Sequence, residues 1–333
     1  MTRVACDLAL LLFSALVYPG LLSLSALALA TQYLVRKLSA RFQRRMGPSY
    51  VGPFGLLQPF FDLLKLLRAK EVVASRYGMA VAAELSLLAG IAFLSASTLL
   101  LPLSPCHVRS SFDLFVFFYA ASAVPALALA LAALSMPGPY TSVGVSRLLS
   151  LLTLSEPVFF ISLLVPAYLA TREGGLLASI GEAAANSHAL WRNPLTAAAS
   201  ALCLLAFLVS VQARAMMQPF NIPDAEQEVI AGYKTELSGP LLALATLIHD
   251  VEYAVSLLAA VYVILGGPAP FSGRALEGAA AVAAKYLALV FAATLVKNSM
   301  GRYRVEQGLV QLFKYGLVPA VIAAALAIAY SAL

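Results

Sequence analysis

Carboxyl groups inside apolar segments are the residues of this sequence best suited to chemistry. Four acids lie within long apolar runs, namely Glu84, Glu156, Asp250 and Glu252, and Glu236 lies at the edge of another run. A charge at the centre of a bilayer costs about 2.5–3.5 kcal/mol on insertion scales, so such groups face water or the protein interior. Burial disfavours the charged carboxylate and can bring proton exchange into the neutral pH range. These acids are therefore candidate proton carriers.

Their spacing leaves two interpretations open. His249 and Glu252 are three residues apart and share a helix face, with Asp250 in the same turn, which favours a proton relay. The alternative is a set of ion pairs that hold helices together. Cations in or beside apolar runs could form such pairs: Arg147, Lys285 and Lys297. From the residues alone, both interpretations have equal weight.

The composition identifies an integral membrane protein. Hydrophobic residues make up 61% of the chain and charged residues 11%, whereas soluble domains carry about 25% charged residues. The basic residues lie in short loops beside apolar segments, so we expect membrane lipid and no nucleic acid as a partner. The cysteines Cys6, Cys106 and Cys203 are scattered, without the spacing of a zinc or iron–sulfur site. We therefore expect no metal on this chain.

Eight apolar segments are long enough to cross a bilayer and predict an all-α membrane protein, with one membrane domain over residues 1–333. The predicted spans are 7–34, 78–103, 113–136, 147–170, 194–216, 238–265, 276–297 and 310–332. Pro19-Gly20 and Pro125 predict kinks, and residues 174–190 predict a surface segment. Most Lys and Arg residues lie in the loops after the first, third, fifth and seventh spans. The positive-inside rule places these loops in the cytoplasm and both termini outside.

The first cytoplasmic loop, residues 36–76, holds the densest charge. Gly47-Pro48 and Gly52-Pro53 are turn dipeptides that end the preceding helix. Polar residues then recur at a spacing of three and four, which predicts an amphipathic helix with one polar face. These residues are Gln58, Asp62, Lys65 and Arg68. The polar face would line a wet site, or the helix would lie at the interface with its cations reaching water.

A second cytoplasmic loop, residues 214–237, is acidic. It contains the run Pro-Phe-Asn-Ile-Pro-Asp-Ala-Glu-Gln-Glu at 219–228 and is expected on the same side as the first loop. The two loops could pair, with Arg44, Arg45 or Arg68 on one side and Asp224, Glu226 or Glu228 on the other. The alternative is a solvated acidic loop that repels anionic lipid.

These motifs resemble the bacterial complex I membrane protein known as the H subunit. The resemblance rests on Gln-x-Arg-x-Gly-Pro at 43–48, Val-Gly-Pro-Phe-Gly-Leu-Leu-Gln-Pro at 51–59, the Asp62/Lys65 pair, Lys70-Glu71 and the acidic run at 219–228. Further matches are Tyr140, Gly144, Arg147, Glu156, Glu252-Tyr253, Arg302, Arg304, Glu306 and Gln307. The resemblance covers nearly the whole chain.

The resemblance implies a membrane subunit of a proton-translocating NADH (or other donor):quinone oxidoreductase in a prokaryotic cell membrane. Its cytoplasmic loops would shape the chamber where the substrate quinone is reduced, with Arg45, Gln58, Asp62, Lys65, Phe220, Asp224, Glu226 and Glu228. Its acids would begin a proton path toward antiporter-like membrane subunits, with Glu156, Glu236, Glu252, Asp250 and Glu84. Iron–sulfur clusters and flavin would lie on peripheral-arm partner subunits.

The sequence departs from the family pattern before Pro219. The family commonly carries a Glu and an Arg there, and Arg214 and Met217 occupy those offsets, while Glu84 stands where Pro is common. The alternative function is therefore the homologous subunit of an energy-converting hydrogenase or ferredoxin-driven ion pump without quinone. The Val-Gly-Pro-Phe-Gly segment favours the quinone branch. A stand-alone transporter is disfavoured, because the two loops show no inverted repeat.

Overall fold

The computed structural model describes residues 8–105, 110, 112–172, 178–271 and 275–332. Within these ranges every regular element is a helix. Eight helical segments of the described chain are long and apolar enough to cross a membrane: Ala9–Phe42, Ala80–Leu100, Asp113–Ser135, Pro139–Thr171, Pro194–Arg214, Gly239–Val263, Ala275–Ser299 and Val305–Ser331. The predicted all-α class with eight spans is confirmed.

The first half of the chain begins with α1 (Leu8–Leu16), α2 (Leu21–Phe42), η1 (Pro53–Gly55), α3 (Gln58–Arg68), α4 (Ala80–Ser97) and η2 (Thr98–Leu100). It continues with α5 (Asp113–Phe118), η3 (Tyr119–Ala123), α6 (Val124–Ser135) and α7 (Pro139–Thr171). The predicted kink at Pro19-Gly20 is the break between α1 and α2. Before Pro125 the span contains a π-helical turn, η3, rather than a break.

The second half begins with α8 (Ile180–Leu190), α9 (Pro194–Arg214), α10 (Glu226–Val229), η4 (Gly232–Lys234) and α11 (Gly239–Val263). It ends with α12 (Ala275–Ser299), α13 (Val305–Leu312), a second π-helical turn η5 (Phe313–Leu317), and α14 (Val318–Ala332). Helix α8 forms within the stretch for which we predicted a surface segment.

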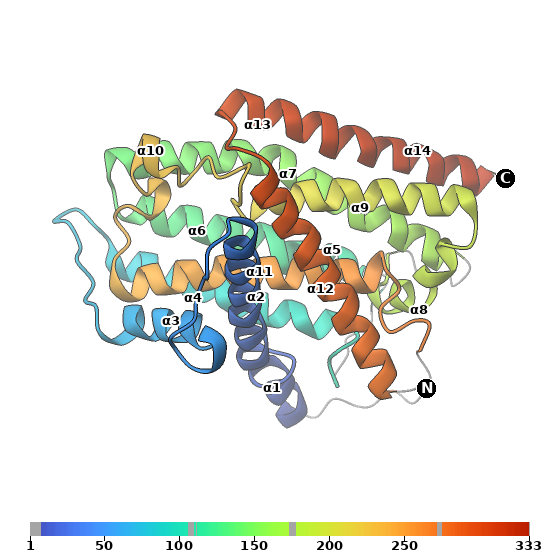
Figure 1. Cartoon of the computed structure of the whole chain (residues 1–333), viewed down its shortest axis with the longest axis horizontal. Helices are drawn as coiled ribbons and strands as arrows, with labels where there is room; N and C mark the ends of the chain where they lie inside the picture. The colour runs from blue at the N-terminus through green and yellow to red at the C-terminus, as the bar shows by residue number, and fades with distance from the viewer. Residues whose placement is uncertain (1–7, 106–109, 111, 173–177, 272–274, 333) are drawn as a thin grey trace.

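The spans form a bundle in which most helices run along one axis (Figure 1). Helices α7, α9, α11 and α14 lie along the long axis of the molecule, whereas α2 and α12 cross them obliquely. The loop helices α3 and α10 lie at one end of the bundle, and α8 lies at the other end. The loops at 36–76 and 214–237, which we name the first and second signature loops, are therefore on the same side of the spans, as the alternation of spans predicts.

Helix α7 is longer than predicted at its start. We expected the span to begin near residue 147, but the helix begins at Pro139, where the fixed φ of proline suits the first helical position. The additional turns carry the buried residues Thr141 and Gly144. They extend α7 beyond the apolar segment and place its first turns against the second signature loop.

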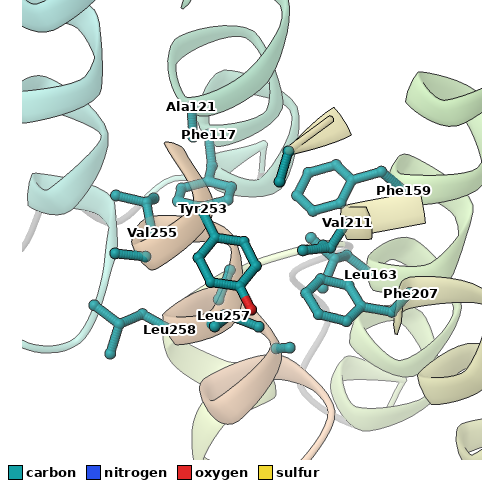
Figure 2. Close-up of a cluster of buried hydrophobic side chains, with 14 of the residues drawn as sticks. Phe117, Ala121, Phe159, Leu163, Phe207, Val211, Tyr253, Val255, Leu257 and Leu258 are labelled. Atoms are coloured by element: carbon teal, nitrogen blue, oxygen red, sulfur yellow. The ribbon is translucent and has the colours of Figure 1, made fainter. Parts of the chain in front are cut away.

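The hydrophobic core runs through the bundle, and one part of it lies where α5, α7, α9 and α11 meet (Figure 2). The close-up shows Tyr253 of α11 between Phe117 and the ring pair of Phe159 and Phe207. The centroids of these two rings are 5.8 Å apart. Phe117, Phe159 and Phe207 are all fully buried. Burying aromatic rings contributes strongly to stability and closes this part of the bundle to water.

Candidate functional site

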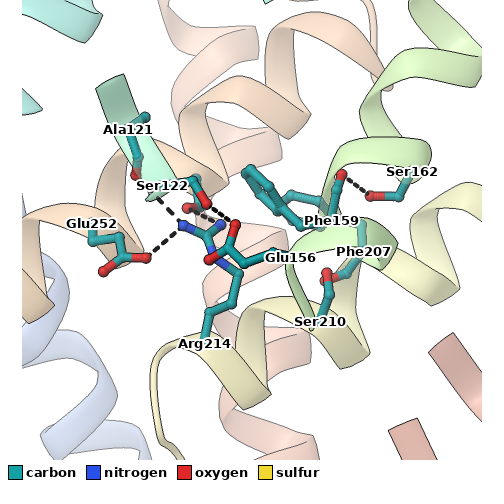
Figure 3. A network of polar contacts seen from close by, with 10 residues as sticks. Ala121, Ser122, Glu156, Phe159, Ser162, Phe207, Ser210, Arg214 and Glu252 are labelled. Atoms are coloured by element: carbon teal, nitrogen blue, oxygen red, sulfur yellow. Dashed lines mark hydrogen bonds and ion pairs between the residues drawn. The ribbon is translucent and has the colours of Figure 1, made fainter. Parts of the chain in front are cut away.

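A buried arginine joins two of the carboxylates predicted from the sequence (Figure 3). Arg214 is the last residue of α9, and its Nε lies 3.2 Å from Glu156 Oε1 of α7. Its Nη2 lies 2.5 Å from Glu252 Oε1 of α11. The side chains of Arg214, Glu156 and Glu252 are 2%, 16% and 8% exposed, respectively. We name these three residues the buried triad.

Further contacts complete the surroundings of Arg214. Its Nη1 donates to Ser256 Oγ at 3.3 Å, and its Nη2 to the Ala121 carbonyl at 3.5 Å. The guanidinium also stacks over the Phe159 ring, 3.8 Å from the centroid. On the far side of the cluster, the Ser122 hydroxyl donates to Glu156. A water-excluded cation–π contact of this kind stabilises a buried cation by about 2 kcal/mol.

The π-helical turn η3 supplies two of these contacts. Ala121 and Ser122 both lie within Tyr119–Ala123. A π-helical turn adds a residue to an α-helix and occurs often at functional sites. Here it directs one backbone carbonyl and one hydroxyl at the buried triad.

The cation that neutralises the buried acids is none of the three considered from the sequence. Arg147 instead binds Glu228 at 2.6 Å. Lys285 Nζ donates to three carbonyl groups at the end of α11, those of Leu265, Gly267 and Ala269. Arg214 takes their place because three helices from distant parts of the sequence converge on it.

A separate pocket of about 190 Å³ lies between α2, α3 and α11. It brings together charged side chains from four elements: Arg36, Asp62, Lys234, His249 and Asp250. Arg36 Nη1 binds Asp62 Oδ2 at 2.8 Å, and Gln58 Nε2 donates to Asp62 Oδ1 at 2.8 Å. The structure therefore pairs Asp62 with Arg36 of the neighbouring helix, and Lys65 is exposed. We name this the α3 pocket.

His249 joins the α3 pocket to the end of α9, next to the buried triad. Its Nε2 lies 2.5 Å from the carbonyl oxygen of Ala215, the residue that follows Arg214. Its Nδ1 lies 3.5 Å from Asp250 Oδ1, near the limit of a hydrogen bond. The side chains of His249 and Asp250 are each 14% exposed. One imidazole ring thus contacts both the pocket acid and the end of α9.

The acidic loop is fastened by ion pairs other than those expected. Glu228 binds Arg147 of α7 at 2.6 Å and Arg302 at 2.7 Å. The hydrogen bond from Arg147, together with the charges of Arg302, Arg147 and Arg304, lowers the pKa of the Glu228 carboxyl. Asp224 binds Lys234 within its own loop at 3.2 Å. The expected pairs with Arg44, Arg45 and Arg68 do not occur in the described structure.

A close backbone approach also holds this loop on α7. A Cβ added at Gly144 would lie 2.3 Å from the Tyr233 nitrogen, and one at Gly232 would lie 1.7 Å from the Pro223 carbonyl oxygen. Only glycine permits both contacts. The neighbouring Tyr233 is fully buried, and burial raises the pKa of its hydroxyl to about 12. The loop therefore packs against α7 and is not a solvated segment.

Comparison with known proteins agrees with this architecture and these motifs. The profile of a family described as NADH dehydrogenase matches residues 15–329. The chain belongs to the NADH dehydrogenase family. It is 28% identical to the H subunit of the NADH-quinone oxidoreductase of Phocaeicola vulgatus over 314 residues, which cover 90% of this chain and 85% of that protein. The resemblance to the H-subunit family is thus confirmed.

The fold of this NADH dehydrogenase family member also recurs in a solved structure. A chain of the membrane-bound sulfane sulfur reductase, an archaeal respiratory membrane complex, matches it with a TM-score of 0.76. The match covers 96% of this chain and 99% of that chain at 22% sequence identity. At this identity the comparison shows a shared fold.

The other predicted site residues of the family member line neither the buried triad nor the α3 pocket. Arg45 lines a second cavity of about 420 Å³ together with Arg36 and Lys297. Phe220 is buried and packs on Tyr303, with ring centroids 5.8 Å apart. The remaining three differ in exposure: Glu226 and Glu84 are exposed, and Glu236 is half-buried beside Gly138.

Sequence reasoning missed one residue and one contact of this site in the NADH dehydrogenase family member. Arg214 was noted only as a departure from the family pattern, although it is a lone cation at the end of an apolar span. The contact of His249 with Ala215 has no sequence signal, because it depends on where α9 ends against α11. Of the cysteines, Cys203 is buried, and Cys6 and Cys106 lie outside the described residues.

Proposed function

We propose that this chain is the membrane subunit of a complex I-like, proton-translocating oxidoreductase. One observation supports this function most: the charged α3 pocket lies close to the buried triad, and His249, which lines the pocket, contacts Ala215 directly after Arg214. The membership of the family and the likeness to the H subunit of an NADH-quinone oxidoreductase support a respiratory complex of a prokaryotic cell membrane. The signature loops would face the cytoplasm, with both termini outside.

The α3 pocket is the proposed wall of the quinone chamber. Ligand pockets usually enclose about 300–1,000 Å³, so a pocket of 190 Å³ needs a partner to complete it. The first loop around it exposes apolar side chains, among them Tyr50 and Phe54. Exposed apolar patches of this kind typically mark contact surfaces. A peripheral-arm redox subunit would cover this face, carrying the iron–sulfur clusters and flavin that we place on partner chains.

Within the chamber, we assign a binding role to the pair of Asp62 and Arg36. A cation and a carboxylate held 2.8 Å apart can donate to and accept from the oxygens of a quinone head group. Gln58 orients Asp62 from within α3. Arg45, Lys65, Phe220, Asp224, Glu226 and Glu228 are assigned to the surrounding loops, where they shape or brace the chamber.

The buried triad is the proposed start of the proton path. Glu252 lies near the midpoint of α11 and Glu156 near the midpoint of α7, so both acids lie deep in the bundle. On one side of them the core is filled by Phe117, Phe159 and Phe207 (Figure 2). Protons would therefore leave sideways, toward antiporter-like membrane subunits, with Asp250, Glu236 and the exposed Glu84 as further carriers.

A second candidate is the equivalent coupling subunit of a complex without quinone. The fold matches a chain of an archaeal sulfane sulfur reductase over nearly its full length. Arg214 and Met217 also depart from the pattern of the quinone-reducing family at the start of the acidic loop. In this candidate the triad would keep its role, and the α3 pocket would couple to a different electron acceptor.

The decisive experiment is an assay of the intact complex purified in mild detergent. We expect inhibitor-sensitive quinone reduction that falls at least about tenfold in Asp62→Asn, because the variant loses the charge that holds Arg36. Glu71→Gln is the matched control, since Glu71 is an exposed acid of the same loop. It should retain wild-type activity.

The outcomes separate the candidates. An assembled Asp62→Asn complex with wild-type quinone reductase activity would contradict the chamber role. A wild-type complex that evolves hydrogen or uses ferredoxin but does not reduce quinone would establish the second candidate. Replacing both Glu156 and Glu252 by Gln should abolish proton translocation in either case, and wild-type translocation would refute the proton path.

A further inference from the structure

His249 occupies the boundary between two polar regions that are otherwise separate. It lies on α11, three residues before Glu252, and lines the α3 pocket with Asp62 and Asp250. The void beside Arg214, Ala215 and Glu252 has no room for a water molecule. No water therefore bridges the pocket and the triad at that void, and the contacts between them are made by protein groups.

The contact with Ala215 determines the tautomer of His249. A backbone carbonyl can only accept a hydrogen bond, so Nε2 must carry the proton in the 2.5 Å contact. The neutral ring then has its free lone pair on Nδ1, which faces Asp250. His249 can therefore gain a proton at Nδ1, whereas the proton on Nε2 ends at a carbonyl that cannot pass it on.

In this geometry His249 can gain or lose a positive charge, but it cannot pass a proton on to the buried triad. When Nδ1 takes up a proton that enters the α3 pocket from water, an O–H bond of the hydronium breaks, an N–H bond forms and the ring becomes an imidazolium beside Asp250. The ring gains a positive charge about one helical turn from Glu252. That charge attracts the Glu252 carboxylate and repels the Arg214 guanidinium.

Charged groups from several neighbouring elements surround this ring and its partners. On its own helix they are Asp250 and Glu252, and from the elements packed against it they are Arg36 of α2, Asp62 of α3, Glu156 of α7, Arg214 of α9, Lys234 of η4 and Lys297 of α12, whose charge interacts with Asp250. Asp62 and Lys234 are each paired, with Arg36 and Asp224 respectively. Asp250 is therefore the acid best placed to stabilise the charged ring.

We propose that His249 is a positioning residue that couples proton occupancy of the α3 pocket to the strength of the ion pair between Arg214 and Glu252. The charged ring would loosen the Arg214–Glu252 pair and free the Glu252 carboxylate to accept a proton. The neutral ring would restore the pair, while the bond to Ala215 keeps the end of α9 in place. This inference rests on the proposed function, since it assigns regulation to the proposed proton path.

The test compares three variants of the whole complex in proteoliposomes, with redox turnover and proton uptake measured separately from pH 5 to 9. His249→Gln offers an amide donor to the Ala215 carbonyl but cannot take a charge. Thr246→Val alters another residue that lines the pocket, whose hydroxyl bonds only within α11. His188→Gln removes an exposed histidine whose Nδ1 bonds within α8, at the opposite end of the bundle.

For His249→Gln we expect about threefold fewer protons translocated per electron, within the range of measured couplings between sites. The pH dependence of this ratio should also flatten. Thr246→Val and His188→Gln should both leave the ratio and its pH dependence unchanged. A wild-type ratio and pH profile in His249→Gln would overturn the inference, because a merely structural cap would be replaced by the glutamine.

A second readout keeps this inference distinct from the proposed function. If the wild-type complex does not reduce quinone, the quinone role fails, and the coupling is then tested by infrared spectroscopy of the carboxyl groups after a pH jump. The carboxyl band lost in Glu252→Gln should respond to the jump in the wild type and lose that response in His249→Gln. An unchanged response would contradict the coupling independently of the electron acceptor.

Discussion

Arg214 carries the charge balance of the buried triad. Arginine stays protonated in proteins, so the triad has one cation and two acids, and its net charge depends only on the protons bound to Glu156 and Glu252. Removing one partner from a buried ion pair leaves an uncompensated charge and typically costs 3–5 kcal/mol. The same arginine that limits proton exchange therefore also holds three helices together.

Arg214→Met should destabilise the complex, because two buried carboxylates lose their counter-charge. We expect a loss of about 3–5 kcal/mol, seen as a lower Tm or failed assembly. Adding Glu156→Gln and Glu252→Gln to this variant should restore much of the stability. If Arg214→Met alone had the wild-type Tm, the ion pairs would contribute nothing to stability.

At this scale the sequence predicted the acids and missed the cation. Glu156 and Glu252 were found because a carboxylate in an apolar run is unusual, whichever helix it contacts. Arg214 lies at the end of its span. A cation is ordinary at that position, because it interacts favourably with the partial negative charge of the helix C-terminus. Which acids it meets depends on the packing of α7, α9 and α11, which a single sequence does not specify.

At the scale of elements, the longer α7 and the acidic loop form one unit. Glu228 bridges Arg147 of α7 and Arg302, and Gly144 lets the loop backbone contact the helix. The loop runs directly from Arg214, the end of α9, so its docking also fixes the position of the triad cation. Sequence patterns predicted a site here but paired it with the first loop, because both were expected on one face.

The docking of this loop should weaken in acid. The pKa of Glu228 is lowered in the folded state, so its stabilising contribution is complete above the ordinary Glu value and is lost as pH falls through the lowered value. We expect limited proteolysis after residue 214 to become faster over that range. Glu228→Gln should be cleaved quickly at neutral pH with little further acid effect, and identical profiles in both proteins would exclude this role of Glu228.

At the scale of the whole molecule, the apolar segments alone predicted the eight spans. Length and hydropathy determine whether a helix can cross a bilayer, and these quantities are local. The oblique paths of α2 and α12 across the other helices (Figure 1) were not predictable. They follow from side-chain packing between distant helices, such as the bond from Gln43 to Asn298.

Sidedness is testable on the intact cell membrane with single cysteines in a background that lacks the native three. Tyr50 of the first loop and Arg192 between α8 and α9 are both exposed. Tyr50→Cys should react with an impermeant thiol reagent only in inverted vesicles stripped of the peripheral arm, and Arg192→Cys only in whole cells. The reverse pattern would place the signature loops outside and contradict the proposed peripheral-arm partner.

The π-helical turn before Pro125 has a consequence for how this site tolerates insertions and deletions. Each residue of an α-helix turns the chain by about 100°. Deleting one residue within 119–123 would convert the turn to a regular α-helix without breaking the span. It would also rotate α5 relative to α6, carrying Ala121 and Ser122 away from Arg214 and Glu156. A single-codon deletion could thus uncouple the triad while leaving a continuous membrane helix.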